Sequence, residues 1–287
     1  MLAKMDSPSE APSCLASLSS MKQFDFGQNW SEFSAKAANA ERVAQARAHF
    51  SALMAGLELE GKTFLDIGFG QGFSLLSARA RGAVTVGCDI NPKCHQVIAR
   101  NRSLFLDVAT GPIPLHVGSI LDDATVAVLR SMDNVGGLGF DIVHSWGVLH
   151  HTGDLRRALA SAGSLVRPGG HFVVAIYNRH WSSLPWLWIK ALFVHSPGWI
   201  QRLMIGVLYP VIWLAKWAVT GKDPNSKERG MDFYYDVVDW VGGYPYEYAT
   251  IGEMEAMCRP LGFTLVRAVR AIVPTGCNEF VFSKCNG

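Results

Sequence analysis

Alternating strand-like and helix-like segments between residues 63 and 177 constrain the fold most. Short apolar runs rich in β-branched residues are separated by stretches in which apolar residues recur at helical spacing. Because a crossover helix joins neighbouring parallel strands, this alternation predicts an α/β protein with a parallel sheet and helices on both faces. The expected strands are 63–67, 83–90, 113–118, 140–146 and 171–177.

The helices expected between these strands occupy 73–80, a segment from Pro92, 121–132 and 154–166. The turn Arg167-Pro168-Gly169-Gly170 is expected to end the last of them, because proline lacks an N–H donor and glycine tolerates left-handed geometry. An amphipathic helix is expected at 40–57. Near the chain end we expect a helix at 251–261, started by a Thr250–Glu253 capping box, and strands at 263–269 and 278–283.

Three segments lie outside this core. Residues 1–20 are rich in Ser, Ala and Pro and lack a continuous apolar run, which predicts a disordered tail and no secretory signal. Residues 21–60 are expected to form a helical flap. Residues 178–249 do not follow the alternation and are expected to form an inserted helical lid, which leaves 61–177 and 250–287 as the core domain.

Composition narrows the class of protein. The chain is 49% hydrophobic and 17% charged, which excludes a disordered chain. Its net charge of +2 argues against a globally basic nucleic-acid binder, so we expect no nucleic-acid partner. The six cysteines form no CxxC pair and no zinc-finger spacing, and we therefore expect no metal site. Reduced thiols favour a cytoplasmic location.

The segment LDIGFGQG, residues 65–72, is the most informative motif. Gly68, Gly70 and Gly72 fall at a strand-to-helix turn, where glycine lets a ligand approach the backbone and the helix start offers free N–H groups. Asp89 ends the next strand, where a carboxylate can accept hydrogen bonds from both ribose hydroxyls. The pattern predicts a nucleoside-containing ligand.

The same motif discriminates between two kinds of cofactor. Its spacing is GxGxG, and Phe73 stands where a dinucleotide fingerprint would have glycine. Asp66 would place negative charge beside a pyrophosphate, which is unfavourable at low local dielectric. A ligand with an ammonium and a sulfonium but no phosphate, such as S-adenosylmethionine, suits this turn better.

Together these features resemble a class I S-adenosylmethionine-dependent methyltransferase. The resemblance rests on LDIGFGQG, Asp89, HSWGVLHH (144–151) and RPGG (167–170), and it covers about 61–177 and 250–283. It implies a Rossmann-like seven-stranded, mostly parallel sheet with an antiparallel last strand. It also implies S-adenosyl-L-methionine as the cofactor.

The resemblance further implies which residues contact the cofactor. In this family the glycine turn holds the methionine part and the acid after the second strand holds the ribose, here Asp89 with Ile90 beside it. Ser119 and Ile120 would flank the adenine, although the family often has an acidic residue at position 119. The end of the fourth strand adds Ser145 and Trp146 to the expected cofactor contacts.

Polar side chains at the carboxyl end of the sheet are the candidates for acting on the methyl acceptor. His150 and His151 follow the fourth strand, where ligands bind in open α/β folds, and either could serve as a general base. Tyr177 and Asn178 end the fifth strand on the same side and could orient the acceptor. For each of them a purely structural role is the alternative.

Two further segments are expected to reach this site. In FDFGQNW (24–30), Asn29 and Trp30 are candidate substrate contacts on a flap, or else an aromatic staple that packs a helix onto the sheet. In the Gly-Gly-Tyr-Pro turn that precedes the last helix, Tyr244 could contact substrate and Tyr246 could take part in catalysis. Backbone hydrogen bonding by these tyrosines is the alternative.

The inserted segment has an unusual charge pattern. No Asp or Glu occurs from Leu155 to Lys222, where eight Lys or Arg occur, and six of the nine tryptophans lie within 181–217. The pattern fits a lid over an apolar acceptor, or a peripheral membrane surface at 181–219. A membrane-spanning helix at 203–219 is a third interpretation, but its 17 residues fall short of the roughly 20 required.

These observations predict a methyltransferase that acts on a hydroxyl or thiol of a small, apolar or aromatic molecule. We expect it to be cytoplasmic, with membrane contact through 181–219 if the peripheral interpretation holds. The alternatives are an NAD(P)-dependent reductase and a non-catalytic module that binds a cofactor or docks on a membrane. The sequence leaves the acceptor atom and the oligomeric state open.

Overall fold

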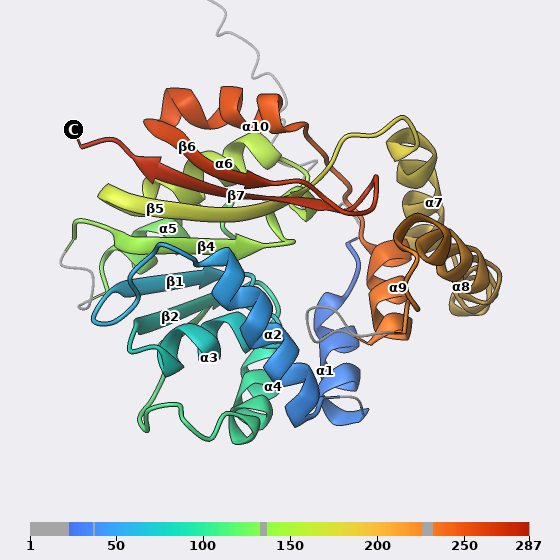
Figure 1. Ribbon diagram of the computed structural model, residues 1–287, viewed down its shortest axis with the longest axis horizontal. Coiled ribbons are helices and arrows are strands. Elements are labelled where there is room, and N and C mark those ends of the chain that lie inside the picture. Colours follow the sequence, from blue (N-terminus) through green and yellow to red (C-terminus); the bar gives the residue numbers. More distant parts are fainter. Residues whose placement is uncertain (1–22, 37, 133–136, 226–231, 287) are drawn as a thin grey trace, which may run out of the picture.

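A computed structural model describes residues 23–36, 38–132, 137–225 and 232–286. The tail predicted for residues 1–20 lies outside the described residues. Seven strands form one sheet in the order β3-β2-β1-β4-β5-β7-β6. Figure 1 shows the sheet flanked by helices on both faces, with β4 pointing toward the helices of the insert.

The parallel part of the sheet contains β1 (Thr63–Ile67), β2 (Val84–Asp89), β3 (Leu115–Val117), β4 (Phe140–Trp146) and β5 (Val166–Tyr177). The last strand, β7 (Cys277–Lys284), pairs antiparallel with both β5 and β6 (Phe263–Val269). The predicted seven-stranded α/β fold, with its antiparallel last strand, is therefore confirmed.

Alternation of side chains along the strands divides the core into two layers. On one face, α5 (Asp123–Arg130), α6 (Leu155–Ser164) and α10 (Ile251–Cys258) pack against buried strand residues such as Leu65, Val143 and Phe172. On the other face, α2 (Ala40–Leu53), α3 (Phe73–Ala80) and α4 (Lys93–Asn101) pack against Phe64, Ile142 and Val173. Successive strand residues point to opposite faces, so both layers come from the same strands.

The Arg167-Pro168-Gly169-Gly170 segment differs from its prediction. It does not end a helix, because α6 ends at Ser164 and the segment lies inside β5. The pairing of β4 with β5 shifts there, from Phe140 opposite Val166 to Ile142 opposite His171, so the extra residues of β5 bulge out. Gly169 has a φ of +71°, and a Cβ at Gly170 would lie 2.8 Å from the Asp141 carbonyl oxygen. Glycine is needed here for a bulge in a strand.

The insert is helical, as expected. It contains α7 (Ser183–His195), α8 (Gly198–Thr220) and α9 (Phe233–Gly242), which share a small apolar core. In Figure 1, α7 and α8 lie at the right-hand edge, and α9 lies between them and α1 (Phe26–Lys36). Helix α8 is continuous over 23 residues, which is long enough to cross a membrane. The expectation that this segment is too short to span a membrane, based on the 17 residues 203–219, is therefore wrong.

Candidate functional site

A cavity of about 560 Å³ lies at the carboxyl ends of the parallel strands. One end is lined by the glycine turn after β1 and by the loops after β2 and β3. The other end is lined by α9, by the C-terminal half of α8 and by residues 273–277 before β7. The cavity therefore joins the predicted cofactor residues of the core to the predicted acceptor side in the insert.

The glycine turn adopts the geometry that its sequence predicts. Gly68 and Gly70 line the cavity with φ values of +70° and +50°, which disfavour other residues. A Cβ at Gly68 would lie 2.4 Å from Val148, and a Cβ at Gly70 would lie 3.0 Å from Trp30 Nε1. At both positions a Cβ would crowd a neighbouring side chain that also lines the cavity, so the turn requires glycine there.

Asp89 is fixed beside this turn. Gly70 N–H donates to Asp89 Oδ2 at 3.0 Å, and Asn91 N–H donates to Oδ1 at 2.8 Å. Burial raises the pKa of the Asp89 carboxyl, although these backbone hydrogen bonds oppose the shift. The two N–H groups orient a carboxylate whose remaining lone pairs can accept from a pair of hydroxyls.

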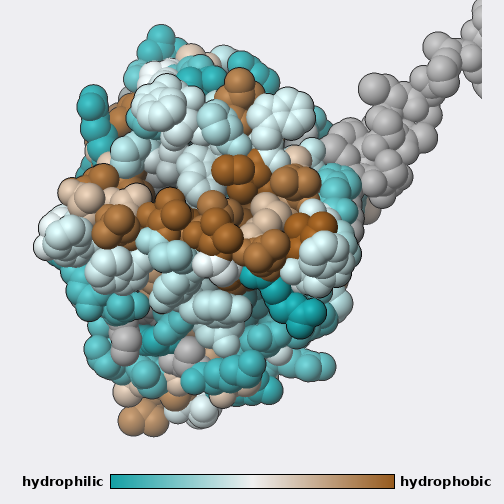
Figure 2. Space-filling model, turned by 90° about the vertical axis from the view of Figure 1, so that its right-hand side faces the viewer, coloured by the Kyte–Doolittle hydropathy of each residue, from teal (hydrophilic) through white to brown (hydrophobic). Residues whose placement is uncertain are grey.

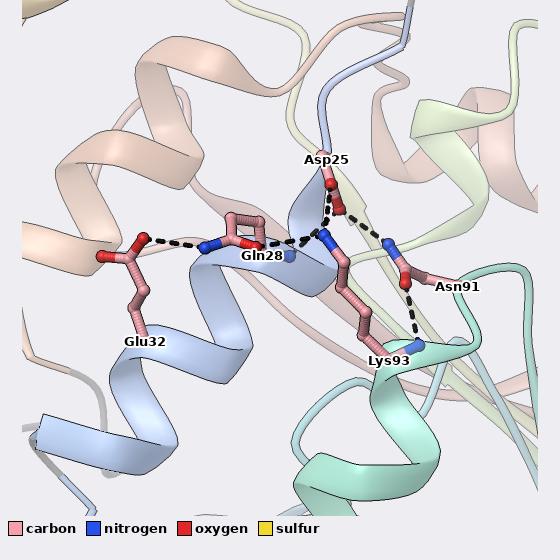
Figure 3. Close-up of polar contacts among 5 residues, drawn as sticks. All are labelled: Asp25, Gln28, Glu32, Asn91 and Lys93. Atoms are coloured by element: carbon pink, nitrogen blue, oxygen red, sulfur yellow. Dashed lines mark hydrogen bonds and ion pairs between the residues drawn. The ribbon is translucent and has the colours of Figure 1, made fainter.

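The N-terminal helix α1 covers this end of the cavity. Figure 3 shows how it is held: Asp25 accepts from Asn91 Nδ2 at 2.7 Å and from Lys93 Nζ at 3.0 Å, and Lys93 also donates to Gln28. Because Asn91 follows Asp89 closely in the chain, this network docks α1 directly beside the Asp89 carboxylate. Trp30, from the same helix, lines the cavity above Gly70.

Asp66 has a buried partner that the sequence did not indicate. Its Oδ1 lies 2.7 Å from Nδ1 of His144, which stands directly opposite it on β4. Both side chains line the cavity, and both are almost completely buried. His144 Nε2 is buried and has no hydrogen-bond partner among the described residues.

The acceptor side of the cavity is aromatic, with Tyr177, His151, Trp240 and Tyr244 in its wall. His151 Nδ1 lies 2.6 Å from the Pro245 carbonyl oxygen, so it must donate, and Nε2 is left as the acceptor. Burial lowers the pKa of His151 to about 3. Burial also raises the pKa of Tyr177 well above its ordinary value. Near neutral pH, His151 is therefore an uncharged imidazole and Tyr177 an uncharged phenol.

Asp239, on α9, adds a carboxyl group to this aromatic wall. Asn29 Nδ2 donates to Asp239 Oδ1 at 2.7 Å, and Asn29 also donates to the Tyr235 carbonyl oxygen. Burial raises the pKa of Asp239 well above its ordinary value, and the hydrogen bond from Asn29 opposes this shift. A carboxylate with a raised pKa is a stronger base than an exposed one.

A family model described as a methyltransferase domain matches residues 37–266, which is most of the chain. The chain belongs to this methyltransferase domain family. The match includes the glycine turn, Asp89 and the whole insert, whereas the lining residues of α1 and of 273–277 lie outside it.

Curated relatives are similar over about half of the chain or less. The chain is 30% identical over 122 residues to a ubiquinone biosynthesis O-methyltransferase of Alkalilimnicola ehrlichii, covering 42% of this chain and 44% of that protein. It is 27% identical over 144 residues to the enzyme of the same name from Rhodopseudomonas palustris, covering 50% of each. The chain thus spans about half the length of the curated relatives it matches.

Solved structures support the fold. An O-methyltransferase family protein from Burkholderia thailandensis has a TM-score of 0.55 at 12% identity, covering 95% of this chain and 68% of that one. A chain from a complex between the Haloferax volcanii Trm112 methyltransferase activator and a methyltransferase has a TM-score of 0.52 at 15% identity, covering 92% and 99%. At these identities the similarity concerns the fold.

The lining residues of this methyltransferase domain fit S-adenosylmethionine. The Asp89 carboxylate is held by two backbone N–H groups and keeps lone pairs that can accept from hydroxyls, and Ile90, Ser119 and Ile120 line the cavity beside it. Gly68, Gly70 and Asp66 lie at the adjoining wall, where Trp146 Nε1 donates to Glu279 Oε1 at 2.8 Å. Among the described residues, no group of three or more His, Cys, Asp or Glu side chains is placed to hold a metal ion.

Some predicted site residues lie outside the cavity lining. Gly72, with a φ of +79°, is the N-cap residue before α3 and packs against Ile98. Ser145 Oγ donates to the Ile67 carbonyl oxygen and so ties β4 to β1. The side-chain amide of Asn29 donates to the Asp239 carboxyl group and does not line the cavity.

The other predicted residues outside the lining pack next to Tyr177 or support the 273–277 segment, although His150 Nε2 and the Tyr246 hydroxyl are buried without a hydrogen-bond partner among the described residues. His150 is fully buried, and its Nδ1 lies 3.4 Å from the Tyr177 backbone nitrogen. Tyr246 packs behind Tyr177 and over the buried Lys190 ammonium, whose nitrogen lies 4.7 Å from its ring centroid. Asn178 donates to the Pro274 carbonyl oxygen and thereby supports the 273–277 segment of the lining. His150, Tyr246 and Asn178 therefore lie behind the cavity wall and do not line it.

Sequence reasoning did not select His144, Glu279 or Asp239, all of which belong to the site or its support. His144 begins the HSWGVLHH segment, and Asp239 lies three residues before the Gly-Gly-Tyr-Pro turn, so the available signal was a polar residue in or next to a motif already identified. Glu279 lies in a strand, and no local signal distinguished it.

Proposed function

We propose that this chain is an S-adenosylmethionine-dependent methyltransferase that methylates a hydroxyl or thiol of a small apolar or aromatic molecule. One observation carries the proposal: a single cavity connects the glycine turn and Asp89 with an aromatic wall that contains Asp239. The family match and the name shared by the curated relatives, ubiquinone biosynthesis O-methyltransferase, favour oxygen as the acceptor atom.

The residues of the cofactor end would bind and orient. Asp89 would accept hydrogen bonds from the ribose hydroxyls, while Trp30 and the α1 network would cover the turn and exclude water. When bound, S-adenosylmethionine supplies an activated methyl group on a sulfonium. Transfer of that methyl group to the acceptor therefore depends mainly on alignment, and this cavity would hold the acceptor in line with the sulfonium.

The residues of the acceptor end would handle the proton. Asp239 is the better general base, because burial raises its pKa above that of an ordinary aspartate, whereas His151, with a pKa of about 3, accepts a proton weakly. Tyr177 would remain a hydrogen-bond donor to the acceptor oxygen or sulfur. An apolar aromatic ring would fit between Trp240, Phe26 and Tyr244, which line the same end.

The test is turnover of S-adenosylmethionine to S-adenosylhomocysteine with a panel of phenols, quinols, thiols and amines, alongside calorimetric titration with S-adenosylmethionine and with NADH. We expect binding of S-adenosylmethionine and turnover with phenols, quinols or thiols. Binding of NADH alone would overturn the proposal in favour of a reductase. Binding of S-adenosylmethionine with turnover of amines alone would overturn the acceptor assignment.

A further inference from the structure

The outer surfaces of α7 and α8 carry stripes of exposed large apolar side chains. They recur every three or four residues and are between 55% and 69% exposed. The stripe residues are Leu184, Trp188 and Leu192 on α7, and Leu203, Val207, Val211 and Leu214 on α8. Figure 2 shows a continuous hydrophobic band across this face of the molecule. A soluble monomer seldom exposes an apolar patch that extends over two helices.

The opposite face of α8 is occupied by the protein itself. Ile205, Leu208 and Ile212 belong to the small core that α8 shares with α7 and α9. Ile212, Ala215 and Val219 also line the cavity. The helix is long and apolar enough to cross a membrane, with only 6% of its most apolar window buried. Crossing would remove Ile212 from both the core and the cavity wall, so a position along the surface is favoured.

The charges and aromatic residues around the stripes indicate what covers them. No acidic residue occurs from 155 to 222, whereas Arg202 on α8 is exposed and Lys222 follows its end. Three tryptophans on these helices are exposed: Trp181 just before α7, Trp188 within α7 and Trp199 at the start of α8. Tryptophan prefers the membrane–water interface, and cations favour anionic headgroups.

We propose that α7 and α8 form a docking surface for an anionic lipid bilayer, with both helices lying in the headgroup region and their stripes directed toward the acyl chains. The inner face of α8 then stays in the wall of the cavity, so the cavity lies one helix away from the bilayer. The proposal goes beyond methyl transfer, and lipid binding can be measured independently of any reaction.

The experiment is flotation of the full chain with vesicles of pure phosphatidylcholine or with about 30% phosphatidylglycerol added. We expect the protein to float with the anionic vesicles. The bound fraction should be lower at high salt, and lower with the neutral vesicles. The double variant Val207→Glu/Val211→Glu should lower the bound fraction about tenfold or more, because carboxylates would enter the apolar region. The matched control is Val128→Glu/Val266→Glu, at exposed valines of α5 and β6, which should bind as wild type does.

Three further measurements keep the test decisive. Emission from the wild-type tryptophans should be quenched by lipids brominated near the headgroup, which needs no variant and settles the case if the double variant does not fold. Equal binding to neutral and anionic vesicles, resistance of the bound protein to carbonate extraction, or no binding at all would each overturn the proposal. So would a dimer in sedimentation that Val207→Glu/Val211→Glu dissociates, since a second copy would then cover the stripes.

Discussion

Asp66 and His144 form a buried pair across two neighbouring strands, with Asp66 Oδ1 2.7 Å from His144 Nδ1. With the carboxylate ionised, Nδ1 must carry the proton, which leaves Nε2 at the cavity without a partner among the described residues. The pair places one polar atom of fixed orientation beneath the glycine turn. It also means that one oxygen of Asp66 is already occupied before any ligand binds.

We expect His144→Ala to destabilise the fold, because the Asp66 carboxylate would remain buried without its partner. Removing one member of a buried pair costs about 3–5 kcal/mol of unfolding free energy. Urea denaturation measures this loss. The double variant Asp66→Asn/His144→Ala should lose less than the sum of the single variants, and strict additivity would show that the two groups do not interact.

Asp89→Ala should weaken S-adenosylmethionine binding by about 1.5–3 kcal/mol, the scale for hydrogen bonds to a charged group. Titration calorimetry gives the affinity directly. The matched control is Asp122→Ala, at an exposed carboxylate in the loop before α5 and outside the cavity lining, which should bind as wild type does. Unchanged affinity in Asp89→Ala would remove the ribose assignment.

The pH dependence of kcat/KM should report Asp239. A base works only when deprotonated, and burial raises the pKa of Asp239, so the rate should rise with pH through a value above that of an ordinary aspartate. Asp239→Asn should abolish this rise and lower the rate by about 10²–10⁴ fold.

Asn29→Ala is the matched variant for Asp239. It removes the same hydrogen bond but keeps the carboxyl group, and since that bond lowers the pKa of Asp239, the rise should move to higher pH. A profile that is the same in wild type, Asp239→Asn and Asn29→Ala would mean that another group, or no group, accepts the proton.

Stability should fall on acidification because of His151. Its pKa is about 3 in the folded protein and 6.5 ordinarily, so the unfolded chain binds more protons between these values. The stabilising difference is fully present above pH 6.5 and is lost toward pH 3, at about 1.4 kcal/mol per pH unit for one group. Unfolding free energies measured from pH 7.5 to 5 should show a shallower slope in His151→Gln. His195→Gln, at an exposed position, should keep the wild-type slope.

The parallel sheet, the glycine turn and the capped last helix could be predicted because their signals are local. Periodicity of apolar residues distinguishes strands from helices, and Gly68, Gly70 and Asp89 hold fixed positions relative to the strand ends. The prediction from local sequence was wrong at Gly169, because a bulge in a strand and a turn that ends a helix both favour Pro and Gly. Only the pairing of β5 with β4 shows that this segment is a bulge.

The partners of the site residues were decided by tertiary structure. His144 meets Asp66 through the register of β4 on β1, and Asn29 meets Asp239 across more than two hundred residues of chain. On α8, apolar residues occur all round the helix, so the sequence could not indicate which face packs on α9 and which is exposed. Local periodicity determines that an element forms, whereas its neighbours are set by packing between distant segments, and the chemistry of this cavity depends on those neighbours.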